Sequence, residues 1–384
     1  MEQVDVAIFG AGIAGASLAW RLAEHRSVAL IEREDQPGYH STGRSAAMFM
    51  ESYGPPMVRA LTRSSRGFYQ QPPPGFASSP IVSLRGALYL AARGQQAQLD
   101  ATRADLAPTC PHLAQLSRVE TLARVPCLRP EKVLAALMDP DSMDLDVHAL
   151  HQGFLRGFRK RGAAFESEMR TSATLTRARH NGQHWRLDFL DGSSVRAKQV
   201  VNAAGAWADE LAAFFDAAPI GLEPRRRSAF TFRAPEGVDA AHWPAVIGID
   251  ESFYFKPDAG QLLGSPANAD PTHPHDVVPE ELDIAKGIYA IEAATTLQIR
   301  RPTSTWAGLR SFVQDGEIVI GFDGVAPSFF WLAAQGGYGI QSAAGASALA
   351  DALIRGVALP EALQREGVKP ESVSPLRLRL RKAI

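Results

Sequence analysis

The sequence is poor in cysteine and carries almost no net charge. Its 384 residues include two cysteines, Cys110 and Cys127, which are too few for a disulfide framework or for a four-ligand zinc site of the usual kind. A formal net charge of −1 creates no general attraction to nucleic acid or to an anionic membrane. These features predict a protein of a reducing compartment that has no nucleic-acid partner.

Long apolar runs are also missing. No run approaches the ~18 residues that a membrane-spanning helix needs. The opening MEQVDVAIFG lacks the basic start of a secretion signal and leads directly into a predicted strand. We therefore expect a soluble, cytoplasmic protein without a transmembrane segment.

Metal-binding motifs are a third absence. His148 and His151 lie near a predicted helix start, and His273 and His275 lie in a proline-rich loop. Neither pair has acidic or cysteine partners at a spacing typical of a metal site. We therefore expect surface histidines and no bound metal ion.

The clearest feature that is present is a glycine-rich turn near the start. An apolar stretch at 4–9 predicts a strand, glycines follow at 10, 12 and 15, and the residues from 13 onward have helical spacing. Gly10 permits a tight turn, Gly12 lets backbone amides approach a diphosphate, and Gly15 lets the helix pack closely on the strand. A second predicted strand ends near Glu32, whose carboxylate can bind a ribose and disfavours NADP. The complete pattern predicts a dinucleotide site.

The segment after the second strand indicates which dinucleotide binds. An NAD-binding domain usually continues with another regular strand–helix unit, whereas EREDQPGYHSTGRSAAMF is small, polar and glycine-bearing. Such a segment suits a loop along an extended cofactor and favours FAD, with an ordinary surface loop as the alternative. The loop residues that we expect to contact FAD are Ser41, Thr42, Gly43, Arg44, Ser45, Ala46 and Ala47.

Two later segments return to the pattern of a cofactor domain. Residues 184–215 predict a hairpin that turns at 191–192, then a strand at 198–203, a turn of small residues and a helix. Residues 317–354 predict two strands, a glycine turn at 336–337 and an alanine-rich helix from about 339. Because no second GxGxxG pattern is present, we expect one dinucleotide site.

The segments between these blocks differ in character and predict a second domain. They include the proline run QPPPGF, the strand patterns RSAFTFRA and SFYFKP, and the loop-rich ANADPTHPHDVVPE. We expect an α/β protein with two interleaved, discontinuous domains. The predicted cofactor domain comprises 1–48, 140–220 and 310–384, and the predicted substrate domain comprises 49–139 and 221–309.

Five motifs spread over nearly the whole chain resemble one family. DVAIFGAGIAGAS, PGYHSTGRSAA, VVNAAGAWAD, TWAGLRSF and AAQGGYGIQ are similar, in this order, to the D-amino-acid oxidase/glycine oxidase superfamily of flavoproteins, and most of all to its bacterial D-arginine dehydrogenase branch. The resemblance implies a Rossmann-like FAD-binding domain of the glutathione-reductase type, interleaved with a mixed-sheet substrate domain. It also implies oxidation of an amine-bearing carbon. Because neither cysteine lies in the C-terminal cofactor segments, we expect the FAD to be non-covalent.

The resemblance further implies a substrate site. Arg310 in GLRSF is expected to bind the substrate carboxylate, since a guanidinium can donate two charge-assisted hydrogen bonds to it. Arg227 is expected to assist, although the run RRRS taken alone favours a solvated face. Tyr254 matches a substrate-contacting tyrosine of the family on a sheet strand, and Tyr53 matches one on a mobile loop over the site.

The glycine-rich segment before the last long helix is expected to face the flavin ring. If that helix starts near Gly339, its free N–H groups and positive dipole end can face the ring, and Gly337 and Gln341 lie near the ring or the substrate. A tight strand-to-helix connection is the alternative. The other residues that we expect to bind the cofactor are Ile13, Ala14, Arg33, Ala204, Gly205, Trp207, Gly336, Tyr338 and Ile340, together with Arg310.

The chain departs from the D-arginine dehydrogenase pattern at two positions. Met48 stands where that pattern has a histidine, and Ala87 stands where it has an acidic residue. A pocket of Met48, Met50, Ala87 and Tyr53 would be apolar and adaptable. We therefore expect a preference for apolar or aromatic D-amino acids over D-arginine and D-lysine, unless Glu51 points into the pocket.

The expected reaction is oxidative deamination of a D-amino acid. A hydride leaves Cα for the flavin, and water hydrolyses the imino acid to a 2-keto acid and ammonia. Oxidation of sarcosine-like secondary amines or of 2-hydroxy acids is the enzymatic alternative, because both need the same carboxylate site. A nucleotide-binding scaffold or electron-transfer subunit is the non-enzymatic alternative. A quinone, an electron carrier and O2 are all open as electron acceptors.

Overall fold

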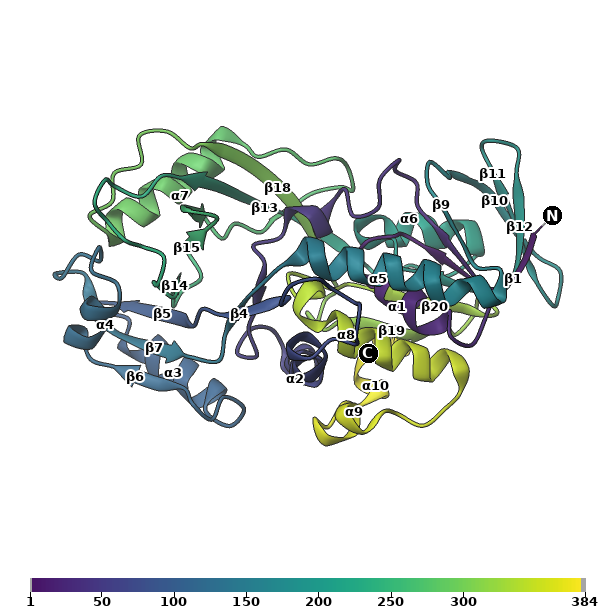
Figure 1. Cartoon of the computed structure of the whole chain (residues 1–384), viewed down its shortest axis with the longest axis horizontal. Coiled ribbons are helices and arrows are strands. Elements are labelled where there is room, and N and C mark those ends of the chain that lie inside the picture. Colours follow the sequence, from purple (N-terminus) through teal and green to yellow (C-terminus); the bar gives the residue numbers. More distant parts are fainter. Residues whose placement is uncertain (1, 381–384) are drawn as a thin grey trace.

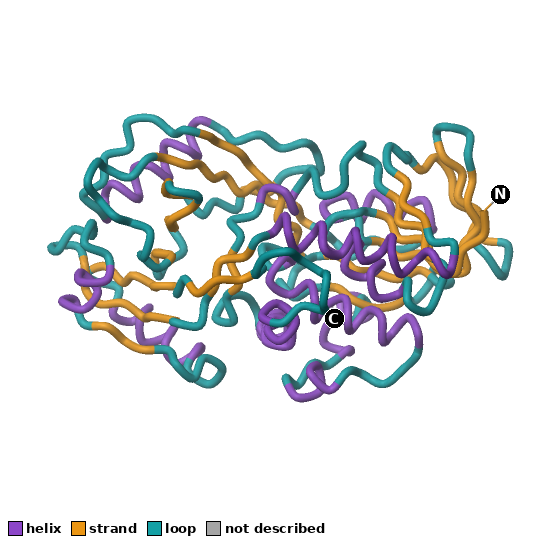
Figure 2. Tube along the Cα trace, viewed as in Figure 1, coloured by secondary structure: helices purple, strands orange, loops and turns teal. Residues whose placement is uncertain are grey.

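The structure, a computed structural model, describes residues 2–380. Two lobes share the chain, one around an eight-stranded sheet and one around a nine-stranded sheet, and both termini lie with the first lobe (Figure 1). Figure 2 shows the strands gathered in these two regions, with helices packed around them. The fold is therefore mixed α/β, as the sequence predicts.

The eight-stranded sheet has a parallel centre. Strands β9, β2, β1, β12 and β20 run parallel in this order, and β10, β11 and β19 are antiparallel additions. The strands of this sheet are β1 (Glu2–Phe9), β2 (Val28–Ile31), β9 (Glu168–Arg170), β10 (Leu175–His180), β11 (Trp185–Phe189), β12 (Ser194–Asn202), β19 (Val319–Phe322) and β20 (Phe329–Ala333).

One predicted boundary in this sheet is wrong. The hairpin strand and the strand expected separately at 198–203 are one continuous strand, β12. Its first half pairs with β11 and its second half pairs with β20, while β1 runs along its other edge. The neighbour on one edge changes from β11 to β20, but the backbone of β12 continues as one strand through the predicted boundary at residue 198.

The nine-stranded sheet is mostly antiparallel. Its order is β17-β13-β16-β15-β14-β5-β7-β6, with β18 on the other edge of β13, and only β14 and β5 pair in parallel. Its strands are β5 (Ala87–Ala92), β6 (Ala114–Leu116), β7 (Val133–Asp139), β13 (Glu223–Phe232), β14 (Ala245–Gly248), β15 (Tyr254–Asp258), β16 (Gln261–Ser265), β17 (Asp270–Pro271) and β18 (Ser304–Phe312).

A small third sheet and the helices complete the fold. The third sheet contains β3 (Met48–Phe49), β4 (Val82–Leu84) and β8 (Met143–Leu145). The helices are α1 (Ile13–Leu22), α2 (Pro56–Gln70), α3 (Gln96–Leu106), α4 (Arg118–Arg124), α5 (Val147–Gly162), α6 (Ala208–Ala212), α7 (Glu281–Ala294), α8 (Gly339–Arg355), α9 (Glu361–Arg365), α10 (Pro370–Val373) and α11 (Leu376–Leu380). Short 3-10 turns lie at Ser41–Arg44, Ala163–Phe165, Gly205–Trp207 and Ala213–Phe215. Between residues 2 and 380, no helix combines the length and the apolar character that crossing a membrane requires.

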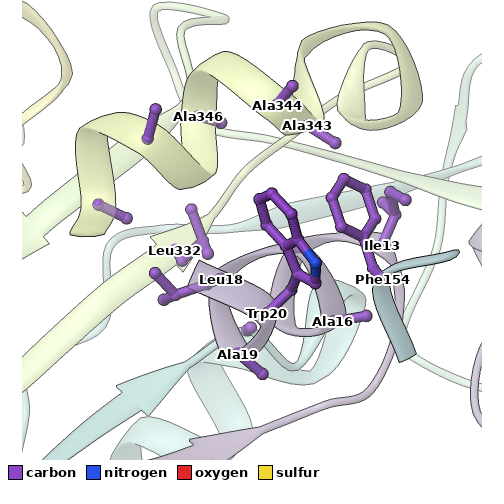
Figure 3. Packing of buried hydrophobic residues seen from close by; sticks show 14 of the residues in the cluster. Ile13, Ala16, Leu18, Ala19, Trp20, Phe154, Leu332, Ala343, Ala344 and Ala346 are labelled. Carbon is purple, nitrogen blue, oxygen red and sulfur yellow. The ribbon is translucent and has the colours of Figure 1, made fainter. Parts of the chain in front are cut away.

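Helix α1 is buried on nearly all sides because α5 and α8 flank it. The small residues of α8 make this close packing possible, since alanine and glycine let helix backbones approach. Figure 3 shows the Trp20 indole between Phe154 and the alanines of α8, and the Trp20 and Phe154 rings meet edge to face with centroids 5.6 Å apart. The Rossmann-like helix is thus fixed from both sides, which holds its N-terminus in place.

The close contact between α2 and α8 gives a stability prediction. A Cβ atom added to Gly345 would lie 2.3 Å from Ser64 Oγ and 2.4 Å from the Leu61 carbonyl oxygen. We expect Gly345→Ala to lower the free energy of unfolding by about 2 kcal/mol, the usual cost of overpacking. Urea denaturation of the FAD-loaded protein measures this change.

Gly67 in the last turn of α2 provides the control. A Cβ atom added there meets nothing within 4 Å. Gly67→Ala is expected to raise the free energy of unfolding by roughly 0.5–1 kcal/mol, because alanine is the better helix former. If the two substitutions change stability in the same direction, the interpretation of the α2–α8 contact is wrong.

Chain segments that cross from one lobe to the other bring two of the predicted site residues together. Helix α2 packs against α8, and the nine-stranded sheet keeps β18 as far as Phe312. Tyr53 and Arg310 therefore lie where the two lobes meet. The assignment of each chain segment to a cofactor or a substrate domain stays a prediction.

Candidate functional site

Three cavities adjoin one another, and two of them lie where the lobes meet. The central cavity lies between the β1–α1 turn, β18 and the segment before α8. It shares Gly12, Ser41 and Thr42 with a second cavity, here called the Trp207 cavity, and Arg227, Tyr254 and Arg310 with a third, here called the methionine cavity. The shared walls make one elongated site with the central cavity in the middle.

Most of the predicted site residues line these cavities. In the central cavity they are Gly12, Ile13, Ala14, Ser41, Thr42, Arg44, Ser45, Ala46, Gly205, Arg227, Tyr254, Arg310, Gly336, Gly337, Gly339 and Ile340. The Trp207 cavity adds Gly10, Glu32, Arg33, Ala204 and Trp207. The methionine cavity adds Ala47, Met48, Met50, Tyr53 and Gln341.

Four predicted site residues do not line any of the three cavities. Gly15 packs against the turn instead, since a Cβ there would lie 1.9 Å from the Gly10 carbonyl oxygen. Gly43 packs in the same way on Gly38, and the Tyr338 ring lies edge to face against Tyr53 at 4.9 Å. Ala87 is fully buried in β5. Gly15, Gly43 and Tyr338 thus pack against residues that line the cavities. Ala87 is not part of the pocket wall that the sequence predicts.

The β1–α1 turn has the geometry that its glycines predict. Gly10 has φ +97°, and its N–H donates to the Ile31 carbonyl oxygen at 2.7 Å. A Cβ at Gly10 would lie 2.4 Å from the Ala203 carbonyl oxygen, because the turn passes directly over the end of β12. Thr42 Oγ1 accepts from the Ile13 N–H at 3.0 Å, which ties the loop after β2 to the start of α1.

Polar groups of the loop after β2 are used to join the two lobes. Ser41 Oγ donates to the Leu309 carbonyl oxygen at 2.6 Å. The Arg44 guanidinium donates to the carbonyl oxygens of Val277 and Ala307 at 2.9 and 3.2 Å. This predicted cofactor loop thus also fixes β18, the strand that carries Arg310.

The Trp207 cavity carries the predicted ribose carboxylate. Glu32 accepts from the N–H groups of Ala11 and Glu34 at 2.8 and 3.0 Å, so its carboxylate is fixed at the end of β2. The Trp207 ring lies 4.5 Å from the His40 ring and 4.6 Å from the Arg33 guanidinium. Flat aromatic surface and a fixed carboxylate suit the adenosine half of a dinucleotide.

The glycine-rich segment before α8 closes the central cavity. Helix α8 begins at Gly339 as predicted, so its first N–H groups lack helical acceptors. Gln335 also lines the cavity, and its buried Nε2 has no hydrogen-bond partner in the described part of the chain. A Cβ at Gly337 would lie 2.7 Å from an Arg310 guanidinium nitrogen, so glycine leaves room for that side chain.

These observations fit a bound FAD. The Trp207 and central cavities form one continuous, elongated space that begins at a dinucleotide turn and ends at a helix N-terminus. The unpaired Gln335 Nε2 and the first N–H groups of α8 are hydrogen-bond donors for the polar edge of a flavin. Neither cysteine lines any of the cavities, and burial raises the pKa of Cys110 to about 11 and that of Cys127 to about 12. Protonated thiols outside the site support the prediction that FAD is non-covalent.

Two arginines meet where the central and methionine cavities join. Arg310 on β18 and Arg227 on the neighbouring strand β13 line both cavities. Within residues 2–380, no carboxylate lies within 4.0 Å of either guanidinium. Arg310 donates to Tyr53 Oη at 3.1 Å, and Arg227 donates to the Asn268 carbonyl oxygen. Burial lowers the pKa of Arg310, but the nearby tyrosine phenols outweigh it and leave that pKa above its ordinary value.

Arg227 differs from Arg310 in its surroundings. Burial lowers the pKa of Arg227, and the nearby positive charge of Arg310 lowers it further. An arginine with a depressed pKa is still protonated at neutral pH, because its ordinary pKa is above 12. Two partly buried positive charges without a carboxylate partner therefore form a binding site for an anionic group.

Two tyrosines and one glutamine surround this pair. Tyr254 on β15 lines both cavities beside the arginines. The Tyr53 turn is supported by Gln341 Nε2, which donates to the Tyr53 carbonyl oxygen at 3.0 Å and to Thr62 Oγ1 at 3.1 Å. Gln341 thus positions Tyr53, and both tyrosines can donate a phenol hydrogen to an anion held by the arginines.

The methionine cavity is only partly the apolar pocket that the sequence predicts. Its apolar lining includes Met48, Met50 and Ile247. Lys256 and Glu251 also line it, and the sequence analysis missed both. Lys256 shares a strand face with Tyr254, two residues earlier, so strand alternation could have identified it. Glu251 lies in the turn before β15, where no pattern points to a cavity.

The acidic groups around this cavity are mostly bonded to other side chains. Lys256 Nζ contacts Asp144 Oδ1 at 2.9 Å. Glu51, which the sequence leaves open as a pocket residue, pairs with Arg66 at 2.7 Å and does not line the cavity. Glu251 is the one carboxylate among the described lining residues, and it is exposed at the rim.

The histidine pairs do not form a metal site. No group of three or more His, Cys, Asp or Glu side chains within residues 2–380 could hold a metal ion. The expectation of surface histidines is wrong for His151, which is 4% exposed and bonds through Nε2 to the Ala11 carbonyl oxygen at 2.8 Å. Burial lowers its pKa, so a neutral ring packs under the glycine turn.

Comparison with known proteins identifies relatives of this arrangement. The family described as FAD dependent oxidoreductase (DAO) matches residues 5–352. Mitochondrial dimethylglycine dehydrogenase of Mus musculus is 24% identical over 282 residues, which is 69% of this chain and 30% of that protein, so the chain spans less than a third of that relative.

Solved structures share the fold. Glycine oxidase from Geobacillus kaustophilus superposes with a TM-score of 0.81 at 20% identity, covering 93% of this chain and 96% of that one. Iminodiacetate oxidase from Chelativorans sp. BNC1 superposes with a TM-score of 0.80 at 22% identity, covering 96% and 98%. At these identities the structural likeness shows the fold.

Proposed function

Because the chain belongs to the DAO family of FAD-dependent oxidoreductases, we propose that it oxidises a D-amino acid at Cα. The observation that carries the proposal is the pair Arg310 and Arg227, two positive charges in the cavity wall that have no carboxylate partner among the described residues. An amino acid supplies the missing carboxylate together with an amine-bearing carbon. FAD, when bound, accepts the hydride that leaves this carbon.

The side chains of this protein then orient the substrate. Arg310 and Arg227 bind the α-carboxylate, and the phenols of Tyr53 and Tyr254 donate to it or cover it. Fixing the carboxylate at the junction of the two cavities leaves Cα facing the central cavity and the substrate side chain in the methionine cavity. Water hydrolyses the imino acid that results to a 2-keto acid and ammonia.

The methionine cavity favours uncharged side chains in this proposal. Met48, Met50 and Ile247 offer apolar surface, while Glu51 is paired with Arg66 and Lys256 is paired with Asp144. A cationic side chain would lose hydration without gaining a buried carboxylate. The motifs resemble the D-arginine dehydrogenase branch, but these surroundings support a different side-chain preference.

A substrate panel tests this proposal. We expect D-leucine, D-phenylalanine and D-methionine to bleach the visible flavin absorbance anaerobically, with kcat/KM about tenfold or more above that for D-arginine and D-lysine, which is ~1.4 kcal/mol of selectivity. The L-enantiomers are the control. A tenfold preference for D-arginine would contradict the proposed side-chain preference, and bleaching by no amino acid would contradict the function.

A second candidate is oxidation of N-methylated glycines. It is supported by the likeness to a dimethylglycine dehydrogenase, whose substrate also combines a carboxylate with an amine. Sarcosine and dimethylglycine therefore belong in the same panel, with a 2-hydroxy acid beside them. Faster bleaching by sarcosine or dimethylglycine than by any D-amino acid would favour this candidate. Repeating the panel in air and with a quinone analogue identifies the electron acceptor.

A further inference from the structure

A buried hydrogen-bond chain lies directly behind the Tyr53 turn. Tyr89 Oη donates to Ser52 Oγ at 2.9 Å, and Ser52 Oγ donates to Asp139 Oδ2 at 2.7 Å. Tyr89, Ser52 and Asp139 are 8%, 6% and 3% exposed. None of them lines any of the three cavities described above, yet Ser52 is the immediate neighbour of Tyr53 in the chain.

Asp139, at the far end of the hydrogen-bond chain, is firmly fixed. Asp139 ends β7 opposite Ala87 of β5, inside the nine-stranded sheet. Its Oδ2 also accepts from Ser142 Oγ at 2.8 Å, and its Oδ1 accepts from the Asp141 N–H at 3.1 Å. Because Asp139 is held by the sheet, Ser52 joins the turn to a rigid element.

The near end of the hydrogen-bond chain lies next to the anion site. Tyr53 Oη is the acceptor for Arg310 at 3.1 Å, and its ring packs against Tyr338. On the opposite side, Gln341 of α8 fixes the Tyr53 carbonyl oxygen. The turn is therefore held between α8 of one lobe and β7 of the other.

We propose that Ser52 and Asp139 are positioning residues that set the Tyr53 phenol against Arg310 and so determine the affinity of the carboxylate site. The proposal rests on the carboxylate-binding role proposed above for Arg310 and Tyr53. A hydroxyl–carboxylate hydrogen bond is among the stronger ones in proteins, and its loss also leaves the Tyr89 hydroxyl without its acceptor. Ser52 touches neither substrate nor cofactor in this proposal and acts through its neighbour.

Benzoate, a carboxylate without an amine, is the probe for this test. Its dissociation constant for the FAD-loaded protein is measured from the change in visible flavin absorbance. We expect Ser52→Ala to weaken benzoate binding about tenfold, the order expected for loss of one charge-assisted hydrogen bond. Ser52→Thr, which keeps the hydroxyl, should restore the affinity to within about twofold of the wild type.

Ser142→Ala is the matched control. It removes an identical donor from the same Asp139 oxygen, but the donor belongs to the β7–β8 connection and not to the Tyr53 turn. We expect it to change benzoate affinity by less than about twofold, with flavin content and melting temperature equal to those of Ser52→Ala. Equal weakening by both substitutions would show that Asp139 matters for general stability and would overturn the proposal.

A double-mutant cycle with Tyr53→Phe isolates the proposed route. If Ser52 acts through the Tyr53 phenol, Ser52→Ala should have no further effect on benzoate affinity in the Tyr53→Phe background. A second tenfold loss in that background would overturn the positioning role. If the wild type does not bind benzoate, the proposed carboxylate site is itself wrong, which is a different result from the failure of Ser52 alone. If Tyr53→Phe leaves the benzoate affinity unchanged, the Tyr53 phenol does not set that affinity, and the positioning role of Ser52 and Asp139 is overturned.

Discussion

Arg310→Met is expected to lower kcat/KM for the best amino acid of the panel by about 10²- to 10³-fold. Removing one partner of a buried, hydrogen-bonded charge pair costs roughly 2–5 kcal/mol, because the other charge stays desolvated and unpaired. Methionine keeps much of the side-chain volume and should leave the fold and the bound FAD intact. The carboxylate is bound in both the ground state and the transition state, so most of the loss should appear in KM. Steady-state kinetics with flavin content measured in parallel checks this result.

Arg225→Met is the control for that substitution. Arg225 lies directly opposite Arg310 in the β13–β18 register, but it pairs with Glu223 at 2.6 Å and does not line any of the three cavities. A partly exposed ion pair contributes at most about 1 kcal/mol, so its kinetics should stay close to those of the wild type. Equal losses in the two variants would mean that charge on the sheet, and not a contact with substrate, explains the effect.

Gly10→Ala is expected to have the largest effect on cofactor binding, with FAD affinity falling about 100-fold. Gly10 combines φ +97° with a Cβ position only 2.4 Å from the Ala203 carbonyl oxygen. Strain of this kind costs on the order of 1–3 kcal/mol, and the contact adds to it. The turn can relieve the contact only by moving away from β12, and Gly10 and Ala203 both line the Trp207 cavity. The ratio of flavin to protein after purification, and titration of the apoprotein with FAD, measure the loss.

Gly182→Ala separates backbone strain from crowding. Gly182 has φ +94°, close to that of Gly10, but a Cβ there meets nothing within 4 Å. It lies between β10 and β11, and it does not line any of the three cavities. We expect a stability cost of about 1 kcal/mol and no change in FAD content. A loss of FAD from Gly182→Ala as large as that from Gly10→Ala would rule out crowding against β12 as the cause.

The sequence was most informative where chemistry depends on local geometry. The β1–α1 turn, the start of α8 at Gly339 and the glycine before it at 337 all lie where the motifs predict. Each of these features is decided by a few neighbouring residues, because a tight turn or a helix start needs a particular φ or the absence of a Cβ. The predicted mixed α/β fold and FAD cofactor are confirmed by the family match and by the solved structures of the same fold.

The sequence was least informative where a side chain's neighbours come from distant strands. Ala87 was expected in the pocket wall but is buried in β5, while Glu251 lines the methionine cavity unnoticed. His151 was expected at the surface and instead packs beneath the glycine turn. In each case the direction of the side chain depends on which strands or helices pair across the sheet, and one sequence does not specify that pairing.

By itself, the sequence determined the type of cofactor and the residue types available to bind an anion. The tertiary structure decided which of these residues meet. It brought Arg227 and Arg310 to one junction with no carboxylate of residues 2–380 within 4.0 Å, and it enclosed Glu51 and Asp139 in hydrogen bonds away from the cavity. The physical reason is that a charge acts through its distance from other charges and from water. Those distances exist only once two lobes built from interleaved segments have packed together.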